Sequence, residues 1–129
     1  MTPGMHYGRR MLLHRRRLVS TLLYVRIGTD MLFAWNESKN RTNRNKHGIS
    51  FEMASLVFAD PWEISEVDRT VDGELRWQTV GLIEGISVVT VTHTREGHGD
   101  EIIRIITARK ATPRERRNYE ERRSKAASE

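Results

Sequence analysis

The stretch "ELRWQTVGLIEGISVVTVTH", residues 74–93, decides the fold of this chain. Residues 74–83 have a hydrophobic period of about two, and residues 86–93 are rich in β-branched side chains, so both segments are predicted to be strands. Between them, Glu84-Gly85 is a two-residue sequence typical of a tight hairpin turn. The stretch therefore predicts an antiparallel β-hairpin.

Further strands are predicted on both sides of this hairpin. Residues 62–69 precede it and are followed by a turn at 71–73, whereas residues 101–108 follow a glycine-containing loop at 94–100. Four consecutive strands with short connections predict a four-stranded antiparallel meander.

Helices are predicted on either side of the meander. After a short apolar strand at 31–35, Asn36 is a favourable N-cap for a polar helix over 37–47 that ends at Gly48. Ser50 similarly begins a helix over 51–58, which Asp60-Pro61 stops. "TPRE", residues 112–115, is a capping box that opens a basic C-terminal helix to about residue 126. An N-terminal strand, two helices, a meander and a last helix make an α+β domain.

Composition excludes several classes of protein. The 129 residues are 37% hydrophobic and 30% charged, which fits one soluble domain. The chain has no cysteine, which excludes disulfides, a thiolate nucleophile and a cysteine-based zinc site. No stretch approaches the roughly 18 apolar residues that span a bilayer, so we expect no membrane segment and a cytoplasmic location.

The excess positive charge is confined to the start of the chain. The net charge is +5, and residues 1–30 contain six arginines and one acid, which account for all of it. We expect residues 1–30 to be a poorly ordered basic extension or the product of a mis-assigned start, with the domain beginning at Met31. A basic nucleic-acid-binding arm is the alternative interpretation.

Lys46 and His47 form the first candidate site. As basic groups in a last helical turn, they would complement the negative end of the helix dipole, which is a purely structural role. The functional alternative is that two titratable donors beside a turn take part in catalysis. The local sequence leaves both open.

Arginines within the strands are the second candidate site. Arg104 interrupts the apolar "EIIRIITARK", and a buried strand arginine needs a carboxylate, such as Glu74 or Glu101, or a bound anion such as phosphate. Strict alternation places Arg104 and Arg109 on opposite faces unless a bulge intervenes.

Arg76 beside Trp77 suggests a clamp for a nucleotide, although Trp77 would also suit the core. The histidines lack the spacing of a helical metal site, and His93 and His98, which flank a glycine loop, are expected to be solvated. No metal and no cofactor is therefore expected.

Four blocks carry a resemblance to a known family: residues 33–60, 72–85, 86–94 and 102–120. Their motifs, F-x-W, N-x-x-KHG-x-x-F-x-x-A, G-x-x-x-G and R-I-x-x-A-R-x-A-x-x-x-E-R-x-x-Y, together resemble the BrnT family of bacterial type II toxins. The sequence departs from the family pattern at Asn36, where aspartate is usual, and at Thr107, where serine is usual. The resemblance makes 31–120 the toxin domain and 121–129 the tail of its last helix.

The resemblance implies a RelE-like fold and a ribonuclease that cleaves RNA and inhibits translation. It also implies a BrnA-like antitoxin, which carries a ribbon-helix-helix, neutralises the toxin and forms a heterotetramer with it. DNA would then be bound only through the antitoxin.

Metal-free RNA cleavage needs a base, an acid and cations on the phosphate. Lys46 and His47 are the expected base and acid, Arg76 and Arg109 the phosphate ligands, and Glu74 a weaker base. Arg104, Trp77 and Tyr119 are the expected RNA contacts. Two other functions remain open: a non-catalytic RelE-like co-repressor, and a nucleic-acid-binding protein that uses the basic arm.

Overall fold

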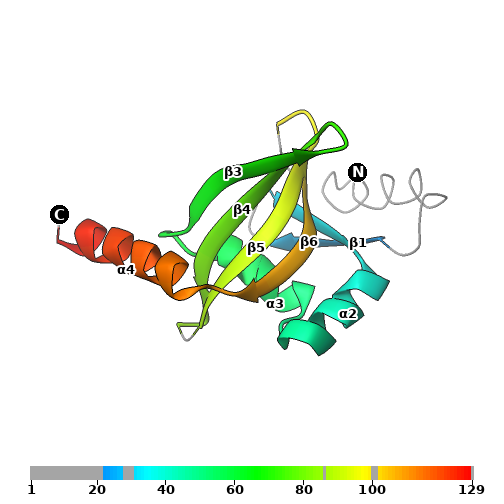
Figure 1. Cartoon of the computed structure of the whole chain (residues 1–129). Coiled ribbons are helices and arrows are strands. Elements are labelled where there is room, and N and C mark those ends of the chain that lie inside the picture. The colour runs from blue at the N-terminus through cyan, green and yellow to red at the C-terminus, as the bar shows by residue number, and fades with distance from the viewer. Residues whose placement is uncertain (1–21, 28–30, 86, 100–101, 129) are drawn as a thin grey trace.

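The computed structural model describes residues 22–27, 31–85, 87–99 and 102–128. In this part of the chain the strands are β1 (Leu22–Ile27), β2 (Met31–Asn36), β3 (Ile64–Val71), β4 (Glu74–Ile83), β5 (Ser87–Glu96) and β6 (Ile102–Lys110). The helices are α2 (Glu37–His47), α3 (Phe51–Ser55), the 3₁₀ helix η2 (Leu56–Ala59) and α4 (Pro113–Ala127). The predicted α+β class is confirmed (Figure 1).

The strands form a single sheet in the order β1-β2-β6-β5-β4-β3. Neighbours from β3 to β6 are antiparallel, and Glu84 and Gly85 at the β4–β5 turn both have positive φ, 51° and 70°, as a tight hairpin turn requires. β2 pairs with β6 in parallel, from Leu32–Ile102 to Ala34–Arg104, which is a long-range pairing that was not predicted from the sequence.

β1 is an additional strand within the segment assigned to the basic extension. It pairs antiparallel with all of β2, from Leu22 opposite Asn36 to Ile27 opposite Met31. The rest of that extension, residues 1–21 and 28–30, lies outside the described residues, as does any nucleic-acid-binding arm there. A domain boundary at residue 31 therefore stays a prediction.

The predicted helix caps are confirmed by hydrogen bonds. The Asn36 side chain accepts from the Lys39 N–H at 3.1 Å, and the Ser50 hydroxyl accepts from the Met53 N–H at 3.1 Å. Thr112 and Glu115 make both bonds of a capping box at the start of α4.

Two predicted boundaries are corrected. The helix expected over 51–58 is a short α-helix that continues as η2, and the strand expected to end at residue 93 continues to Glu96. The second correction changes the position of His93, which lies within a strand and not at the edge of a loop.

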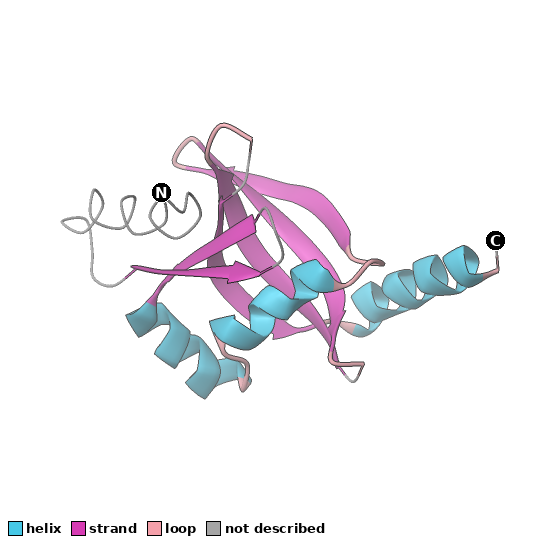
Figure 2. Cartoon of the chain, turned by 180° about the vertical axis from the view of Figure 1, so that it is seen from behind, coloured by secondary structure: helices cyan, strands magenta, loops and turns pink. Residues whose placement is uncertain are grey.

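The sheet has one covered face and one open face. α3 and η2 lie against the covered face (Figure 2), where Phe51, Ala54 and Val57 pack on Val91 and Ile105 in the core. α2 lies beside them and is bonded to the backbone of β6 through Asn43. Figure 1 looks onto the open face, with α4 at one end of the sheet. Because side chains alternate along a strand, Val89, Val91 and His93 of β5 belong to the covered face, and Thr90, Thr92 and Thr94 to the open face.

Candidate active site

A β-bulge in β6 brings the two predicted strand arginines onto the same face. Thr92 is opposite Thr107 but His93 is opposite Ile105, so Ile106 is an extra residue in β6. Arg104 is therefore opposite Thr94, and Arg109 is opposite Thr90, both on the open face. The placement on opposite faces that strict alternation predicts is wrong, and the bulge is the reason.

Arg104 forms a bidentate ion pair with a neighbouring strand residue. Its Nε and Nη2 donate to the Glu96 carboxylate at 2.8 and 3.1 Å. The partner is thus Glu96 of β5 and not Glu74; Glu101, the other expected partner, lies outside the described residues. Both side chains are largely buried, so an incoming phosphate would compete with this carboxylate for the guanidinium.

Arg109 joins the sheet to the last helix. Its guanidinium donates to the two Glu115 oxygens at 2.8 and 3.1 Å, and Glu115 also accepts from the Thr90 hydroxyl and the Thr112 N–H, each at 2.9 Å. The hydrogen bonds from Arg109 are the main reason that the pKa of Glu115 falls to about 2. This cluster holds the start of α4 on the open face.

Arg76 has a weaker partner than the other two arginines. It precedes Trp77, which is opposite His93 on the covered face, so Arg76 lies on the open face. Its Nη2 is 3.6 Å from the exposed Glu74, and its buried Nε has no hydrogen-bond partner among the described residues. A partly exposed guanidinium with an N–H that has no partner among the described residues is suited to bind an anion.

Lys46 and His47 lie in the last turn of α2, and the predicted helix end is confirmed. Gly48 has a φ of 75° and donates its N–H to the Arg44 carbonyl. One turn earlier, the buried Asn43 side chain exchanges two hydrogen bonds, of 2.8 and 3.1 Å, with the backbone of Ala108, next to Arg109. Lys46 is exposed and His47 half-buried, and both are within one turn of this contact.

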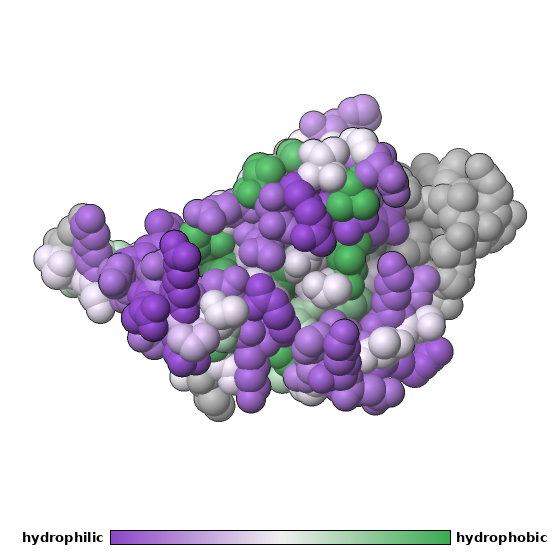
Figure 3. All heavy atoms as spheres, viewed as in Figure 1, coloured by the Kyte–Doolittle hydropathy of each residue, from purple (hydrophilic) through white to green (hydrophobic). Residues whose placement is uncertain are grey.

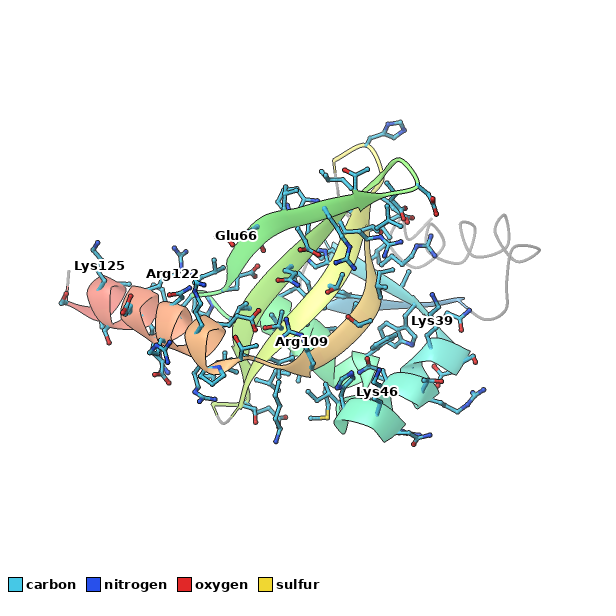
Figure 4. The ribbon with its side chains drawn as sticks, viewed as in Figure 1. Lys39, Lys46, Glu66, Arg109, Arg122 and Lys125 are labelled. Carbon is cyan, nitrogen blue, oxygen red and sulfur yellow. The ribbon has the colours of Figure 1, made fainter. Side chains whose placement is uncertain are left out.

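Figure 4 shows Arg109 between Lys46 of α2 and Arg122 of α4. Figure 3, from the same direction, shows a mostly hydrophilic surface with smaller hydrophobic areas. The open face thus combines the arginines with hydroxyl groups of Thr92 and Thr107, which are directly opposite each other.

Two predicted RNA contacts are not part of this face. Trp77 points to the covered side, where the Arg95 guanidinium lies 3.9 Å from its ring centre, so Arg76 and Trp77 do not form one clamp. Tyr119 is 1% exposed, and its hydroxyl donates to Asp60 at 2.6 Å. Burial raises the pKa of the Tyr119 hydroxyl above its usual range, which opposes a role as a proton donor, and its ring is unavailable for stacking.

His93 is a buried core residue, so the expectation that it is solvated is wrong. Its Nδ1 is 3.3 Å from the Thr94 carbonyl, and its Nε2 is 2.7 Å from the Thr79 hydroxyl, which is bonded to Ser65. Because a carbonyl only accepts, Nδ1 carries the proton and Nε2 accepts from Thr79. Burial lowers the pKa of His93 to about 4, so the ring is neutral near pH 7. The strong β pattern of 86–93 could have indicated this, since His93 continues the covered phase of Val89 and Val91.

A groove between α4 and the sheet was missed by the sequence analysis. It has a volume of about 700 Å³ and is lined by residues of β3, β4 and one side of α4, among them Ile64, Glu66, Gln78, Val80, Asn118 and Arg122. Glu115 also lines it, so the groove adjoins Arg109. The i, i+3, i+7 spacing of Glu115, Asn118 and Arg122 was the available signal.

No group of three or more histidine, aspartate or glutamate side chains suited to a metal ion occurs among the described residues. None of the helices in the described part of the chain is long and apolar enough to cross a membrane.

Comparison with known proteins identifies the family. A family model described as the ribonuclease toxin BrnT of type II toxin–antitoxin systems matches residues 35–115. The 1.1 Å crystal structure of the Brucella abortus ribonuclease toxin BrnT is 25% identical; the match covers 60% of this chain and 92% of that chain, with a TM-score of 0.45. No curated protein sequence matches. Since the family model spans more than half of the chain, the protein belongs to the BrnT family of ribonuclease toxins of type II toxin–antitoxin systems.

Proposed function

We propose that this toxin is a metal-independent endoribonuclease that inhibits translation by cleaving RNA on the open face. The observation that carries the proposal is the shared face of Arg76, Arg104 and Arg109, which the β6 bulge makes possible. Guanidinium groups bind phosphate oxygens with paired N–H donors, and they stabilise the charge that develops on a phosphate during cleavage.

The proposed reaction uses the RNA's own 2′-hydroxyl as the nucleophile. A base removes its proton, its oxygen attacks the adjacent phosphorus, and the bond to the 5′-oxygen breaks while an acid protonates that oxygen. The products are a 2′,3′-cyclic phosphate and a 5′-hydroxyl. We assign the base and the acid to Lys46 and His47, because α2 is anchored beside Arg109 through Asn43. Glu74, beside Arg76, is the weaker candidate for the base.

The arginines differ in how readily they would take a phosphate. Arg104 and Arg109 each hold a carboxylate through two short hydrogen bonds, whereas the only ion pair of Arg76 within the described residues is the 3.6 Å contact with Glu74. We therefore assign the first contact with the RNA backbone to Arg76. Arg109 is opposite Thr90, farther along the sheet and beside α2, so it would stabilise charge on the next phosphate, the one that is cleaved, while remaining bonded to Glu115.

A type II toxin requires an antitoxin, and we propose a BrnA-like protein with a ribbon-helix-helix domain. In this proposal the two proteins form a heterotetramer in the cytoplasm, where the complex binds DNA through the antitoxin alone. Family membership supports the partner class.

The test is expression of the full chain in a bacterium, with and without the neighbouring small open reading frame, together with cleavage of RNA by the purified protein. We expect growth arrest and RNA loss, rescue by the neighbour, 2′,3′-cyclic phosphate ends, and unchanged cleavage in EDTA. Arg76→Ala should abolish arrest, and Arg117→Ala, an exposed arginine of α4, should not.

A non-catalytic co-repressor is the second candidate function. It is favoured by one observation, the neutralisation of Arg104 and Arg109 by Glu96 and Glu115. Intact RNA at full expression, together with promoter repression that tolerates Arg76→Ala, would establish it in place of the nuclease.

A further inference from the structure

The groove beside α4 differs in composition from the adjoining part of the open face, which carries Arg76, Arg104 and Arg109. Its floor is formed by Ile64 and Val80, directly opposite each other on β3 and β4, and the next pair on the same face of these strands is Glu66 and Gln78. Its wall is the side of α4 that carries Asn118, Glu121, Arg122 and Lys125, and Trp62 also lines it. A volume of about 700 Å³ is within the range of about 300–1,000 Å³ that is usual for small-ligand sites.

The contents of the groove suit a nucleobase better than a phosphate. Glu66 and Glu121 would repel a phosphate, but carboxylates accept hydrogen bonds from the amino groups of bases. The Gln78 and Asn118 amides both donate and accept, as recognition of a base edge requires. The apolar floor and the Trp62 ring offer flat surfaces for the faces of a base.

The groove is also continuous with the proposed cleavage site. Val80 is opposite Thr90, and Thr90 is opposite Arg109, so one row of residues leads from the groove floor to the arginine. Glu115 lines the groove and is bonded to Arg109 and Thr90. Figure 4 shows Glu66 on β3 and Arg122 on α4 to one side of Arg109.

We propose that this groove is a nucleobase-binding subsite, which holds an amino-bearing base of the RNA beside the phosphate bound by the arginines. The inference rests on the proposed function, because it takes RNA as the substrate. Arg122 bonds the Trp62 carbonyl through Nε at 3.2 Å, so it ties Trp62 to α4, and in this proposal the rest of its guanidinium and Lys125 contact the RNA backbone. Glu66 is the residue that selects the base, since its carboxylate accepts from the amino groups of adenine, cytosine and guanine, and uracil has no amino group.

The experiment measures binding of the full chain to RNA that it is unable to cleave. Four 2′-O-methyl tetranucleotides, of A, C, G and U, are titrated at one low salt concentration and followed by fluorescence anisotropy. We expect the A, C and G oligonucleotides to bind roughly tenfold more tightly than the U oligonucleotide, and Glu66→Gln to remove most of this difference. Trp62→Ala should weaken all four by roughly tenfold through the loss of stacking.

Arg117→Ala, on the same helix but not lining the groove, is the matched control and should leave all four affinities unchanged. If Trp62→Ala does not fold, Trp62→Phe replaces it, and its affinities should stay close to those of the wild type. Equal affinity for all four oligonucleotides in the wild type and in Glu66→Gln would overturn the proposal.

Cleavage of RNA by the same variants separates this inference from the nuclease itself. Wild-type cleavage with an unchanged base preference in Glu66→Gln and Trp62→Ala overturns the subsite and leaves the nuclease intact. Base-selective binding by a wild-type chain that cleaves no RNA supports the subsite and removes the nuclease. If these variants bind RNA normally but lose the antitoxin, the occupant is a protein segment and the subsite proposal is wrong.

Discussion

The two faces of the sheet share the same strands but satisfy their polar groups in different ways. On the covered face, His93 and Thr79 of β5 and β4 are bonded to each other and fully buried, with Phe58 of η2 edge-on against the His93 ring. On the open face, Arg104 and Arg109 are held by the carboxylates of Glu96 and Glu115, and all four side chains are partly exposed. The covered polar groups therefore serve stability, and the open ones are available for exchange with a ligand.

The largest effect should come from breaking the covered face alone. Phe51 is 0% exposed and contacts Trp35 edge-on, so Phe51→Ala should lower the free energy of unfolding by about 4 kcal/mol. Urea unfolding measures this change. The matched control is Met53→Ala on the same helix, which should cost little because Met53 is 42% exposed. Equal losses of stability in both variants would contradict the interpretation that the buried contacts of Phe51 with the covered face stabilise the fold.

His93 gives the covered face a dependence on pH. Its pKa is about 4 in the folded protein and near 6.5 when unfolded, so the unfolded chain binds the proton first as the pH falls. The contribution of the neutral His93 ring to the free energy of unfolding is complete above pH 6.5 and is lost between pH 6.5 and 4. Its size is about 3 kcal/mol. Thermal unfolding of the wild type and of His93→Phe across this range should show the slope in the wild type only. A similar slope in His93→Phe would assign it to other groups.

Replacing Arg109 should separate effects on RNA cleavage from effects on stability, because Arg109 lies on the open face and also anchors α4. Arg109→Ala should lower RNA cleavage about a hundredfold through lost charge stabilisation, and stability by only about 1 kcal/mol because the ion pair with Glu115 is partly exposed. Arg76→Ala should reduce cleavage similarly without the loss of stability. The comparison uses single-turnover cleavage and thermal unfolding of the same samples, and antitoxin binding should survive in both. Full cleavage by Arg109→Ala would exclude Arg109 from the site.

The sequence predicted those features that depend on neighbouring residues. The Asn36, Ser50 and Thr112 caps, the hairpin at Glu84-Gly85 and the end of α2 at Gly48 were all confirmed, because each depends on local backbone conformation.

The features that the sequence missed depend on pairing between distant segments. The extra residue Ile106 is visible only once β5 and β6 are in register, and it decides that Arg104 and Arg109 share a face. The groove likewise needs α4 to be placed against β3 and β4, and nothing in the sequence of α4 alone indicates its partner strands. The assignment of the site residues stays a prediction. The sequence shows which residue types are present, but it does not show which of them lie close together in the folded chain.

Gly81→Ala should lower the free energy of unfolding less than Phe51→Ala does, and it tests whether the two faces are independent. A Cβ at this position would lie 2.9 Å from Val57 Cγ1 and 3.1 Å from the Val57 carbonyl, so Gly81→Ala pushes η2 away from β4 at a cost of about 2 kcal/mol. Val57→Ala in the same chain should recover part of this loss in urea unfolding, because it removes the nearest atom.

The added Cβ would also lie 3.3 Å from Asp60 Oδ2, which accepts from the Leu82 N–H and from the Tyr119 hydroxyl of α4. A shift of Asp60 would thus move α4 and change the groove on the open face. Altered oligonucleotide binding by Gly81→Ala would mean that covered-face packing positions the groove, whereas unchanged binding would mean that the ion pair of Arg109 with Glu115 positions α4 without help from Asp60.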